Sequence, residues 1–176
     1  NDVGMYANNL TNRIHSNGRY VRLVSADGIG KAVILGAPDP SVALDTWPFG
    51  CGYGARRCAF LQERCAIQGF ALTRGYSNTN ADNLGRRGAA LWLAGGAQVL
   101  DCVITNNVGY QGVAINGSES GLKPTAFAHR CYIADNYPIN PSAFTKTGGT
   151  TGIIRSTTVG SSIVHNNHGN NFGSYE

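Results

Sequence analysis

Three arginines bracket a polar segment near the middle of the chain. Arg74 directly precedes the stretch GYSNTNADNLGRRG at 75–88, Asp82 lies inside it, and Arg86 and Arg87 lie near its end. Guanidinium groups pair with anionic oxygens, so this segment is a candidate for contact with an acidic glycan. Two alternatives remain open: a solvated loop with a local ion pair, and a catalytic loop.

Two tyrosines accompany these charges. Tyr76 opens the same segment, and Tyr110 follows a short apolar stretch further along. Aromatic rings can stack on the faces of sugars, but they can equally pack as surface aromatics between neighbouring parts of the chain. The ligand-binding candidates are therefore Arg74, Tyr76, Asp82, Arg86, Arg87 and Tyr110.

Carboxylates are scarce, with seven Asp and three Glu in the chain. A glycosidase needs two carboxyl groups about 5–10 Å apart, and no sequence motif supplies such a pair. Asp135, Asn106 and Asn166 offer oxygen atoms of the kind that bind calcium. A hydrogen-bonded row of these three side chains is the favoured interpretation, and no other cofactor is expected.

The cysteines and histidines do not have the spacing of a metal site. No CxxC motif occurs among Cys51, Cys58, Cys65, Cys102 and Cys131, and the four histidines are scattered. We therefore expect no tightly bound transition metal. Cys51 and Cys58 are close enough in sequence for a local disulfide, whereas Cys102 and Cys131 lie among apolar residues and are expected to be buried as small hydrophobic side chains.

Composition excludes several classes of protein. The chain has 176 residues, of which 42% are hydrophobic and 14% charged, with 24 glycines and a net charge of +4. This balance argues against disorder, and the mild charge without a recognition motif argues against nucleic-acid binding. No apolar run reaches the length of a membrane span. The chain starts with Asn, so we interpret it as a mature product, a trimmed product or a segment of a longer protein.

The elements that would position these residues are set by an internal repeat. The phrase VLDCVITNN at 99–107 returns as AHRCYIADN at 128–136. The same pattern places Leu72, Ile104, Ile133 and Val164 at equivalent positions, at intervals of 32, 29 and 31 residues. The apolar and polar residues alternate, so each copy is predicted to be a strand with one buried face.

Strands that recur at this interval without helices between them predict a coil that stacks each strand on its equivalent. Leu72, Ile104, Ile133 and Val164 should then form a buried column, and Asp101 should lie beside Arg130. Asn107, Asn136 and Asn167 should form a second column at a corner, with their amides bonded along the axis. We expect these asparagines to adopt the left-handed backbone that a corner needs.

The stretches GAALWLAGGAQVLDCVITNN at 88–107, VRLVSADGIGKAVILGAPDPS and GFALTRGYSN resemble the right-handed parallel β-helix proteins of the pectin-lyase-like kind. The resemblance covers roughly residues 19–170 and is greatest to bacterial secreted and cell-surface repeat proteins. It implies one all-β domain over 1–176, a β-solenoid of about five coils, located outside the cell or at its surface. Lyases, hydrolases, adhesins and tailspikes share this fold, so the fold alone does not assign an activity.

The motifs of the catalytic relatives are absent. The NTD, DD, GHG and RIK motifs of polygalacturonase-like hydrolases do not occur, apart from His168-Gly169, and neither does the WIDH-type motif of pectate lyases. We therefore expect a non-catalytic module that contacts polysaccharide. A lyase or hydrolase acting on an acidic glycan, and a structural or adhesin stalk, are the alternatives.

The two ends of the solenoid need cover. Residues 1–18 are expected to fold over one end as a cap, and Trp47 and Phe49 in TWPFGCGYG at 46–54 are expected to pack as a cap or brace. Only Phe172 and Tyr175 are available beyond the last strand. We expect further coils or a second copy of the chain to complete the C-terminal face.

Overall fold

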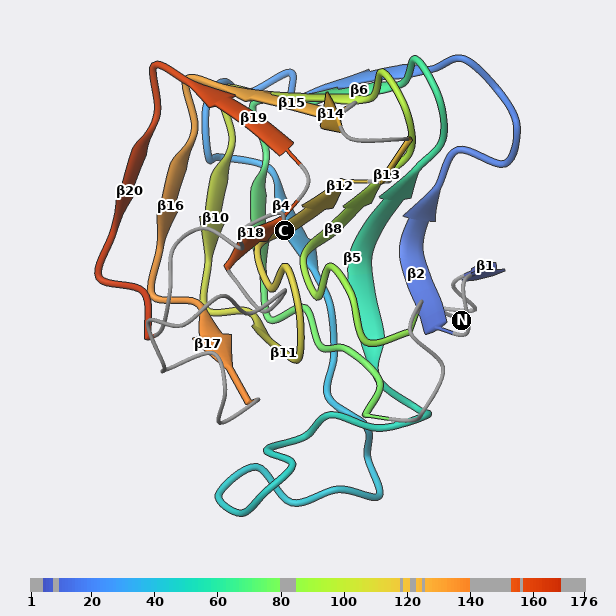
Figure 1. Cartoon of the computed structure of the whole chain (residues 1–176), viewed down its shortest axis with the longest axis vertical. Coiled ribbons are helices and arrows are strands. Elements are labelled where there is room, and N and C mark those ends of the chain that lie inside the picture. The colour runs from blue at the N-terminus through green and yellow to red at the C-terminus, as the bar shows by residue number, and fades with distance from the viewer. Residues whose placement is uncertain are drawn as a thin grey trace.

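The computed structural model describes residues 5–7, 10–79, 85–117, 119–120, 123–124, 126–139, 153–155 and 157–168. All regular secondary structure in these ranges is β-strand, arranged in three sheets around a common interior (Figure 1). The described part of the chain contains no helix with the length and apolarity needed to cross a membrane.

Each sheet takes one strand from each coil, and the first sheet has one further strand at its edge. The strands of the first sheet are β1 (Met5–Ala7), β2 (Leu10–His15), β5 (Arg56–Leu61), β8 (Leu91–Leu93), β12 (Ile115–Gly117) and β18 (Ile154–Arg155). Those of the second sheet are β3 (Arg22–Val24), β6 (Ala66–Gln68), β9 (Gln98–Leu100), β15 (Ala126–His129) and β19 (Thr157–Gly160). Those of the third sheet are β4 (Val33–Leu35), β7 (Ala71–Thr73), β10 (Val103–Thr105), β16 (Tyr132–Ala134) and β20 (Ile163–His165).

Successive coils stack in parallel, from β2 at one end to β20 at the other (Figure 1). The prediction of a right-handed parallel β-helix is confirmed, with five coils. Smaller pairs lie outside the three sheets: β11 (Val108–Gly109) runs parallel to β17 (Tyr137–Pro138), and β13 (Glu119–Ser120) runs antiparallel to β14 (Lys123–Pro124).

The repeated apolar residue occupies one column of the third sheet. Ile104 pairs with Leu72 on one side and with Ile133 on the other, and Ile133 pairs with Val164. Ile34 extends the column into the first coil, where it pairs with Leu72. Leu72, Ile104 and Ile133 are fully buried, because their side chains point into the interior that the three sheets enclose.

The asparagine column forms a hydrogen-bonded ladder. The Asn107 Nδ2 atom donates to Asn136 Oδ1 at 2.8 Å, and the Asn136 Nδ2 atom donates to Asn167 Oδ1 at 3.0 Å. The expectation that these asparagines have left-handed backbone is wrong. Positive φ angles occur one residue earlier, at Arg74, Asn106, Asp135 and Asn166, with values of 50–56°. That preceding residue makes the bend, which turns the next side chain inward.

Residues 10–15 belong to the first coil, because β2 pairs in parallel with β5. Strand β1 then pairs antiparallel with the outer edge of β2. Edge strands offer unpaired backbone groups to other chains, and an antiparallel strand at this edge ends the parallel stacking of the first sheet.

Candidate functional site

The predicted site residues gather at the corner that follows the third sheet. Tyr76 forms a parallel bridge with Val108, which pairs in turn with Tyr137, so these residues occupy equivalent positions in three consecutive coils. Arg74 lies two residues before Tyr76, with an exposed side chain. Asp82 lies outside the described residues.

Arg86 and Tyr110 are in direct contact. The guanidinium carbon of Arg86 lies 4.7 Å from the centroid of the Tyr110 ring, which is cation–π geometry. The Arg86 Nε atom donates to the carbonyl oxygen of Thr79 at 3.0 Å, and the Tyr110 amide donates to Ser77 Oγ at 3.1 Å. The Arg86 side chain is therefore bonded back to the start of the 75–88 segment, and the backbone of Tyr110 is bonded to the same part of the segment.

Arg87 has a different environment. Its backbone carbonyl accepts a bond of 2.6 Å from Arg57 Nη2, and its backbone bridges in parallel to Gln111. The side chain of Arg57 is fully buried, so this bond ties the segment to the interior of the solenoid. The backbone of Arg87 thus helps to set the register of the coils.

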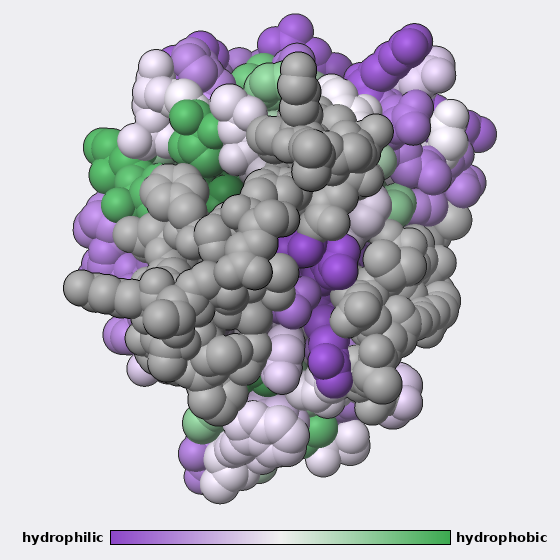
Figure 2. Space-filling view, viewed as in Figure 1, coloured by the Kyte–Doolittle hydropathy of each residue, from purple (hydrophilic) through white to green (hydrophobic). Residues whose placement is uncertain are grey.

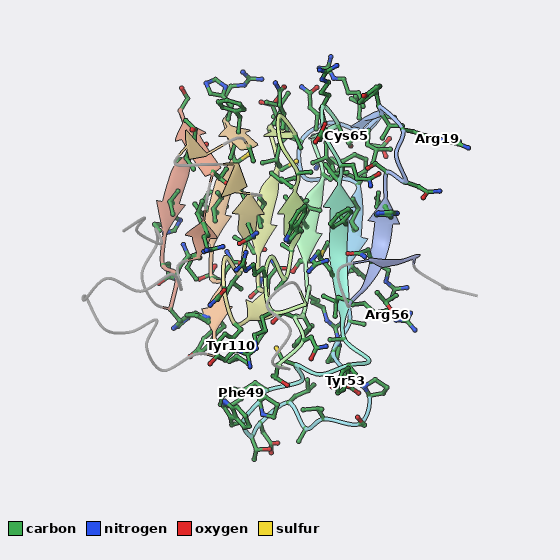
Figure 3. The ribbon with its side chains drawn as sticks, turned by 45° about the vertical axis from the view of Figure 1, so that its right-hand side comes forward. Arg19, Phe49, Tyr53, Arg56, Cys65 and Tyr110 are labelled. Atoms are coloured by element: carbon green, nitrogen blue, oxygen red, sulfur yellow. The ribbon has the colours of Figure 1, made fainter. Side chains whose placement is uncertain are left out.

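A loop that the sequence did not single out as a site projects from this corner. Residues 38–55, which we call the lobe, connect the first coil to β5 and extend beyond the solenoid (Figure 1). Four large apolar side chains of the lobe are exposed: Leu44 (56%), Trp47 (63%), Phe49 (38%) and Tyr53 (72%). The expectation that Trp47 and Phe49 cover an end or side of the solenoid is therefore wrong. Figure 3 shows Phe49 and Tyr53 below Tyr110.

Asp39 holds the lobe in shape. One carboxylate oxygen accepts bonds from the Ser41 amide at 2.9 Å and the Ser41 hydroxyl at 2.7 Å, and the other accepts from the Gly54 amide at 2.8 Å. Burial alone would raise the pKa of Asp39, but these hydrogen bonds outweigh it and lower the pKa. A Cβ atom on Gly52 would lie 2.3 Å from Asp39 Oδ2, so only glycine leaves room for the carboxylate there.

The lobe is also fastened to the corner. The Gly52 amide donates to the carbonyl oxygen of Ser77 at 3.2 Å, and the Cys51 thiol donates to that of Val108 at 3.4 Å. The Tyr76 ring lies close to the Gly50 backbone, and burial raises the pKa of its hydroxyl. The exposed aromatic residues and the Arg86–Tyr110 pair therefore belong to one connected surface, which we call the lobe–corner surface.

The cysteines are five free, buried thiols, so the Cys51–Cys58 disulfide left open by the sequence does not form in this structure. Burial raises the pKa of Cys51, Cys58 and Cys102 to about 12 and that of Cys131 to about 11. Cys102 and Cys131 have the buried packing role predicted for them.

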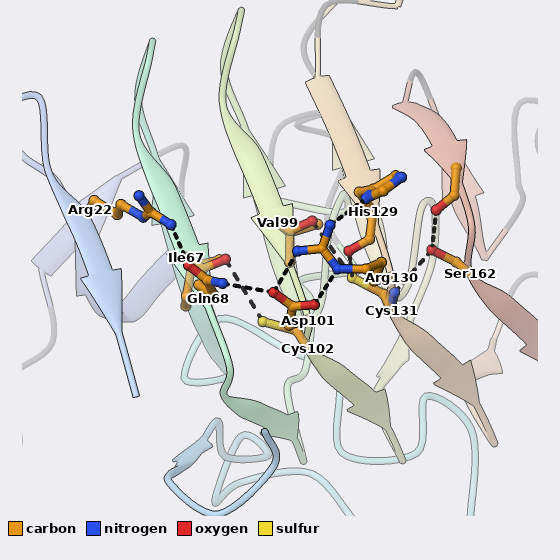
Figure 4. Close-up of polar contacts among 11 residues, drawn as sticks. Arg22, Ile67, Gln68, Val99, Asp101, Cys102, His129, Arg130, Cys131 and Ser162 are labelled. Atoms are coloured by element: carbon orange, nitrogen blue, oxygen red, sulfur yellow. Dashed lines mark hydrogen bonds and ion pairs between the residues drawn. The ribbon is translucent and has the colours of Figure 1, made fainter. Parts of the chain in front are cut away.

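The other polar groups form ladders between coils. Arg130 Nε lies 2.6 Å from Asp101 Oδ1, which confirms the predicted ion pair, and Gln68 Nε2 donates to Asp101 Oδ2 at 2.7 Å (Figure 4). The Asn166 amide nitrogen donates to Asp135, as expected for members of a hydrogen-bonded row. Within the described ranges, no cluster of three or more His, Cys, Asp or Glu residues could hold a metal ion.

A separate groove of about 340 Å³ lies on the outer side of the first sheet. The Phe60 and Trp92 rings stack there with centroids 4.7 Å apart, next to Tyr20, Gln62 and Glu63. Sequence reasoning missed this groove because Phe60 and Trp92 are 32 residues apart and stack only when the coils are in register. Phe60 is almost fully covered by its neighbours, so its ring contributes little contact surface.

No protein-family model, no curated protein and no solved structure matches this chain. The class of the protein is therefore defined by its fold, which is a parallel β-helix with a projecting lobe at one corner.

Proposed function

We propose that this chain is a secreted or cell-surface β-helix module that binds a polysaccharide at the lobe–corner surface. One observation carries the proposal: Leu44, Trp47, Phe49 and Tyr53 are exposed on a loop whose backbone is fixed by Asp39. A rigid backbone that already holds large apolar side chains in water loses little entropy when a ligand binds. Such exposed, fixed side chains are typical of binding hot spots.

A polysaccharide suits the repeating geometry of the corner. Tyr76, Val108 and Tyr137 lie in register along the axis, and His168 stacks on Tyr137 with ring centroids 4.0 Å apart. These three positions, one in each coil, form a row of side chains that a linear polymer can follow over several coils. Sugar C–H faces can pack on aromatic rings, and sugar hydroxyls can bond to the tyrosine hydroxyls and to Arg74 or Arg86.

Binding without turnover is the favoured form of this proposal. Both carboxylate oxygens of Asp39 accept hydrogen bonds from the lobe, and those of Asp101 accept from Arg130 and Gln68. A carboxylate engaged in this way is poorly placed to act as an acid or base on a sugar. The proposal also includes membership of the pectin-lyase-like bacterial repeat proteins and a location outside the cell.

A glycan array probed with the full chain, with and without calcium, tests the proposal. We expect binding by the native chain that is lost in Tyr53→Ala. Phe127→Ala is the control, because Phe127 is also an exposed aromatic residue (44%) but lies on β15, in the second sheet. No binding to any glycan would contradict the proposal and favour a structural stalk. Release of unsaturated uronate, measured by ultraviolet absorbance, would identify a lyase instead.

A further inference from the structure

We infer that the lobe takes a neutral glycan chain of β-linked hexopyranose units rather than an acidic one. This inference rests on the proposed function and names the substrate class of the same surface. It departs from the sequence-based expectation of an acidic glycan, which relied on the arginines around 75–88.

The lobe carries no cationic side chain. Within residues 38–55 the charged side chains are Asp39 and Asp45, and neither Lys nor Arg occurs. Asp39 is buried and committed to Ser41 and Gly54, so Asp45 is the exposed charge. A uronate or sulfate would meet no cation on the lobe and would be repelled by Asp45. Figure 2 shows the lobe at the bottom of the view in mostly pale and green colours, with the densest purple elsewhere.

The nearby arginines lie outside the lobe. Arg86 lies over the Tyr110 ring, and its Nε atom already donates to Thr79. Arg56 directly follows the lobe, and Figure 3 shows it above Tyr53 and away from Phe49. Cations therefore border the lobe, whereas its exposed tip is uncharged apart from Asp45.

The side chains of the tip suit the apolar faces of sugars. In a β-linked hexopyranose with equatorial hydroxyls, the two ring faces present C–H groups. Aromatic rings carry negative charge on their faces and attract such C–H groups. Trp47 and Tyr53 are 63% and 72% exposed, and each has only two side-chain torsions to immobilise on binding.

Phe49 has an unusual backbone conformation. Its φ is 53°, in the left-handed region that disfavours large side chains. Phe49 is the one apolar residue among the non-glycine residues with positive φ in the described part of the chain. Its amide donates to the carbonyl oxygen of Thr46 at 2.6 Å, and the Gly50 amide donates to that of Ala43 at 2.8 Å, which holds this conformation. A strained residue whose ring stays partly exposed is better explained by contact with a ligand than by packing.

A lipid surface fits these features less well. Segments that bind membrane interfaces combine aromatic side chains with Lys and Arg that attract anionic headgroups, and the lobe has no such cation. Lipid binding is therefore an outcome for the experiment to detect.

The test is titration calorimetry with the full chain against four probes: cellohexaose, laminarihexaose, hexagalacturonate and phosphatidylcholine vesicles. We expect at least one neutral hexasaccharide to bind. Trp47→Ala and Tyr53→Ala should each weaken this binding about tenfold or more, and Phe127→Ala should leave it unchanged. Raising the salt from about 50 mM to about 500 mM should change the affinity less than about twofold, because no charges pair.

Salt-sensitive binding of hexagalacturonate that Tyr53→Ala abolishes would overturn the inference and leave the proposed function standing. Binding of hexagalacturonate that the lobe variants leave unchanged would overturn both, because the proposed function places the polysaccharide on the lobe. Vesicle binding that Trp47→Ala abolishes would assign the lobe to lipid and overturn the inference. Failure of every sugar probe and of the glycan array would reject the inference and the proposed function together. Circular dichroism checks folding, and Tyr53→Ala serves alone if Trp47→Ala misfolds.

Discussion

Asp39 Oδ2 accepts a hydrogen bond of 2.8 Å from the amide of Gly54, and this bond joins the two ends of the lobe. The same carboxylate also bonds to Ser41, so one buried side chain fixes the start and the end of a loop that has no core of its own. The display of Trp47, Phe49 and Tyr53 therefore depends on a residue that does not itself face the solvent.

Asp39→Asn should loosen the lobe. The carboxylate of Asp39 accepts hydrogen bonds on both oxygens, whereas the amide of Asn has one acceptor oxygen. We therefore expect a loss of about 1–3 kcal/mol in the free energy of unfolding near neutral pH. The folded-state pKa of Asp39 is lowered, so its stabilisation is present above the ordinary Asp pKa and is lost as the pH falls through the lowered value. Urea unfolding of both proteins from neutral to strongly acidic pH checks this. Curves with the same separation at every pH would contradict it.

The buried column should dominate stability. Ile133→Ala removes a fully buried side chain between Ile104 and Val164 and should lower the free energy of unfolding by about 2–5 kcal/mol. Ile163 is a neighbour on the adjacent strand β20 but is 60% exposed, so Ile163→Ala should cost less than about 1 kcal/mol. Equal losses in urea unfolding would show that these two residues are not placed as described.

Substitution in the asparagine ladder should lower stability more than substitution of the residue at the bend beside it. Asn136→Ala removes bonds to Asn107, Asn167 and the carbonyl oxygens of Ile104 and Ala134, and should lower the free energy of unfolding by about 2–3 kcal/mol. Asn166→Gly removes an exposed bond to Asp135 but places glycine at a φ of 50°, and should cost less than about 1 kcal/mol. Thermal unfolding of both variants checks the contrast, and a larger loss in Asn166→Gly would contradict the assignment of the ladder.

Two substitutions at Phe49 distinguish the effect of backbone strain on stability from the effect of the ring on binding. Phe49→Gly and Phe49→Ala both remove the ring, but only glycine relieves the left-handed backbone, which costs other residues about 1–2 kcal/mol. We expect the glycine variant to be more stable than the alanine variant by up to about 1 kcal/mol, because glycine also loses more freedom on folding. Both should lose polysaccharide binding. If the alanine variant is the more stable one, the strain at Phe49 is not as described.

The five thiols should be unreactive in the folded protein. Cys51, Cys58, Cys102 and Cys131 are buried with raised pKa values, so the reactive thiolate is rare at about pH 8. We expect negligible labelling by a disulfide reagent until denaturant is added, and then labelling of all five thiols. Stability should fall as the pH rises above about 9, where the unfolded thiols ionise first. Rapid labelling of one thiol in the native protein would contradict its burial.

The fold was predictable because residues that stack on one another in successive coils have the same environment. The sequence pattern therefore repeats from coil to coil. Leu72, Ile104, Ile133 and Val164 mark the coils at regular intervals, and the register between coils follows from them. The hydrogen bond between Asn107 and Asn136 was predictable, but the backbone conformation of Asn107 was not. A sequence does not show which of two adjacent polar residues, Asn106 or Asn107, makes the bend.

The site was less predictable because loops have no repeat. The contact between Arg86 and Tyr110 brings together two of the predicted residues, but the position of Arg87 follows from the buried Arg57, whose contacts no sequence pattern shows. Trp47 and Phe49 were expected to be covered because large aromatic residues usually are. The turn residues of PDPSVALDTWPFGCGYG were the available signal, since a stretch rich in Pro, Gly and Asp predicts a loop that projects.

Fluorine NMR of the chain labelled with 5-fluorotryptophan tests the central claim most directly. The chain has two tryptophans, Trp47 in the lobe and Trp92 in the groove of the first sheet, and Trp92→Phe assigns the two signals. We predict that addition of a bound glycan shifts the Trp47 signal and leaves that of Trp92 in place. A shift of Trp92 alone, or of neither signal in the presence of bound glycan, would contradict the assignment of binding to the lobe.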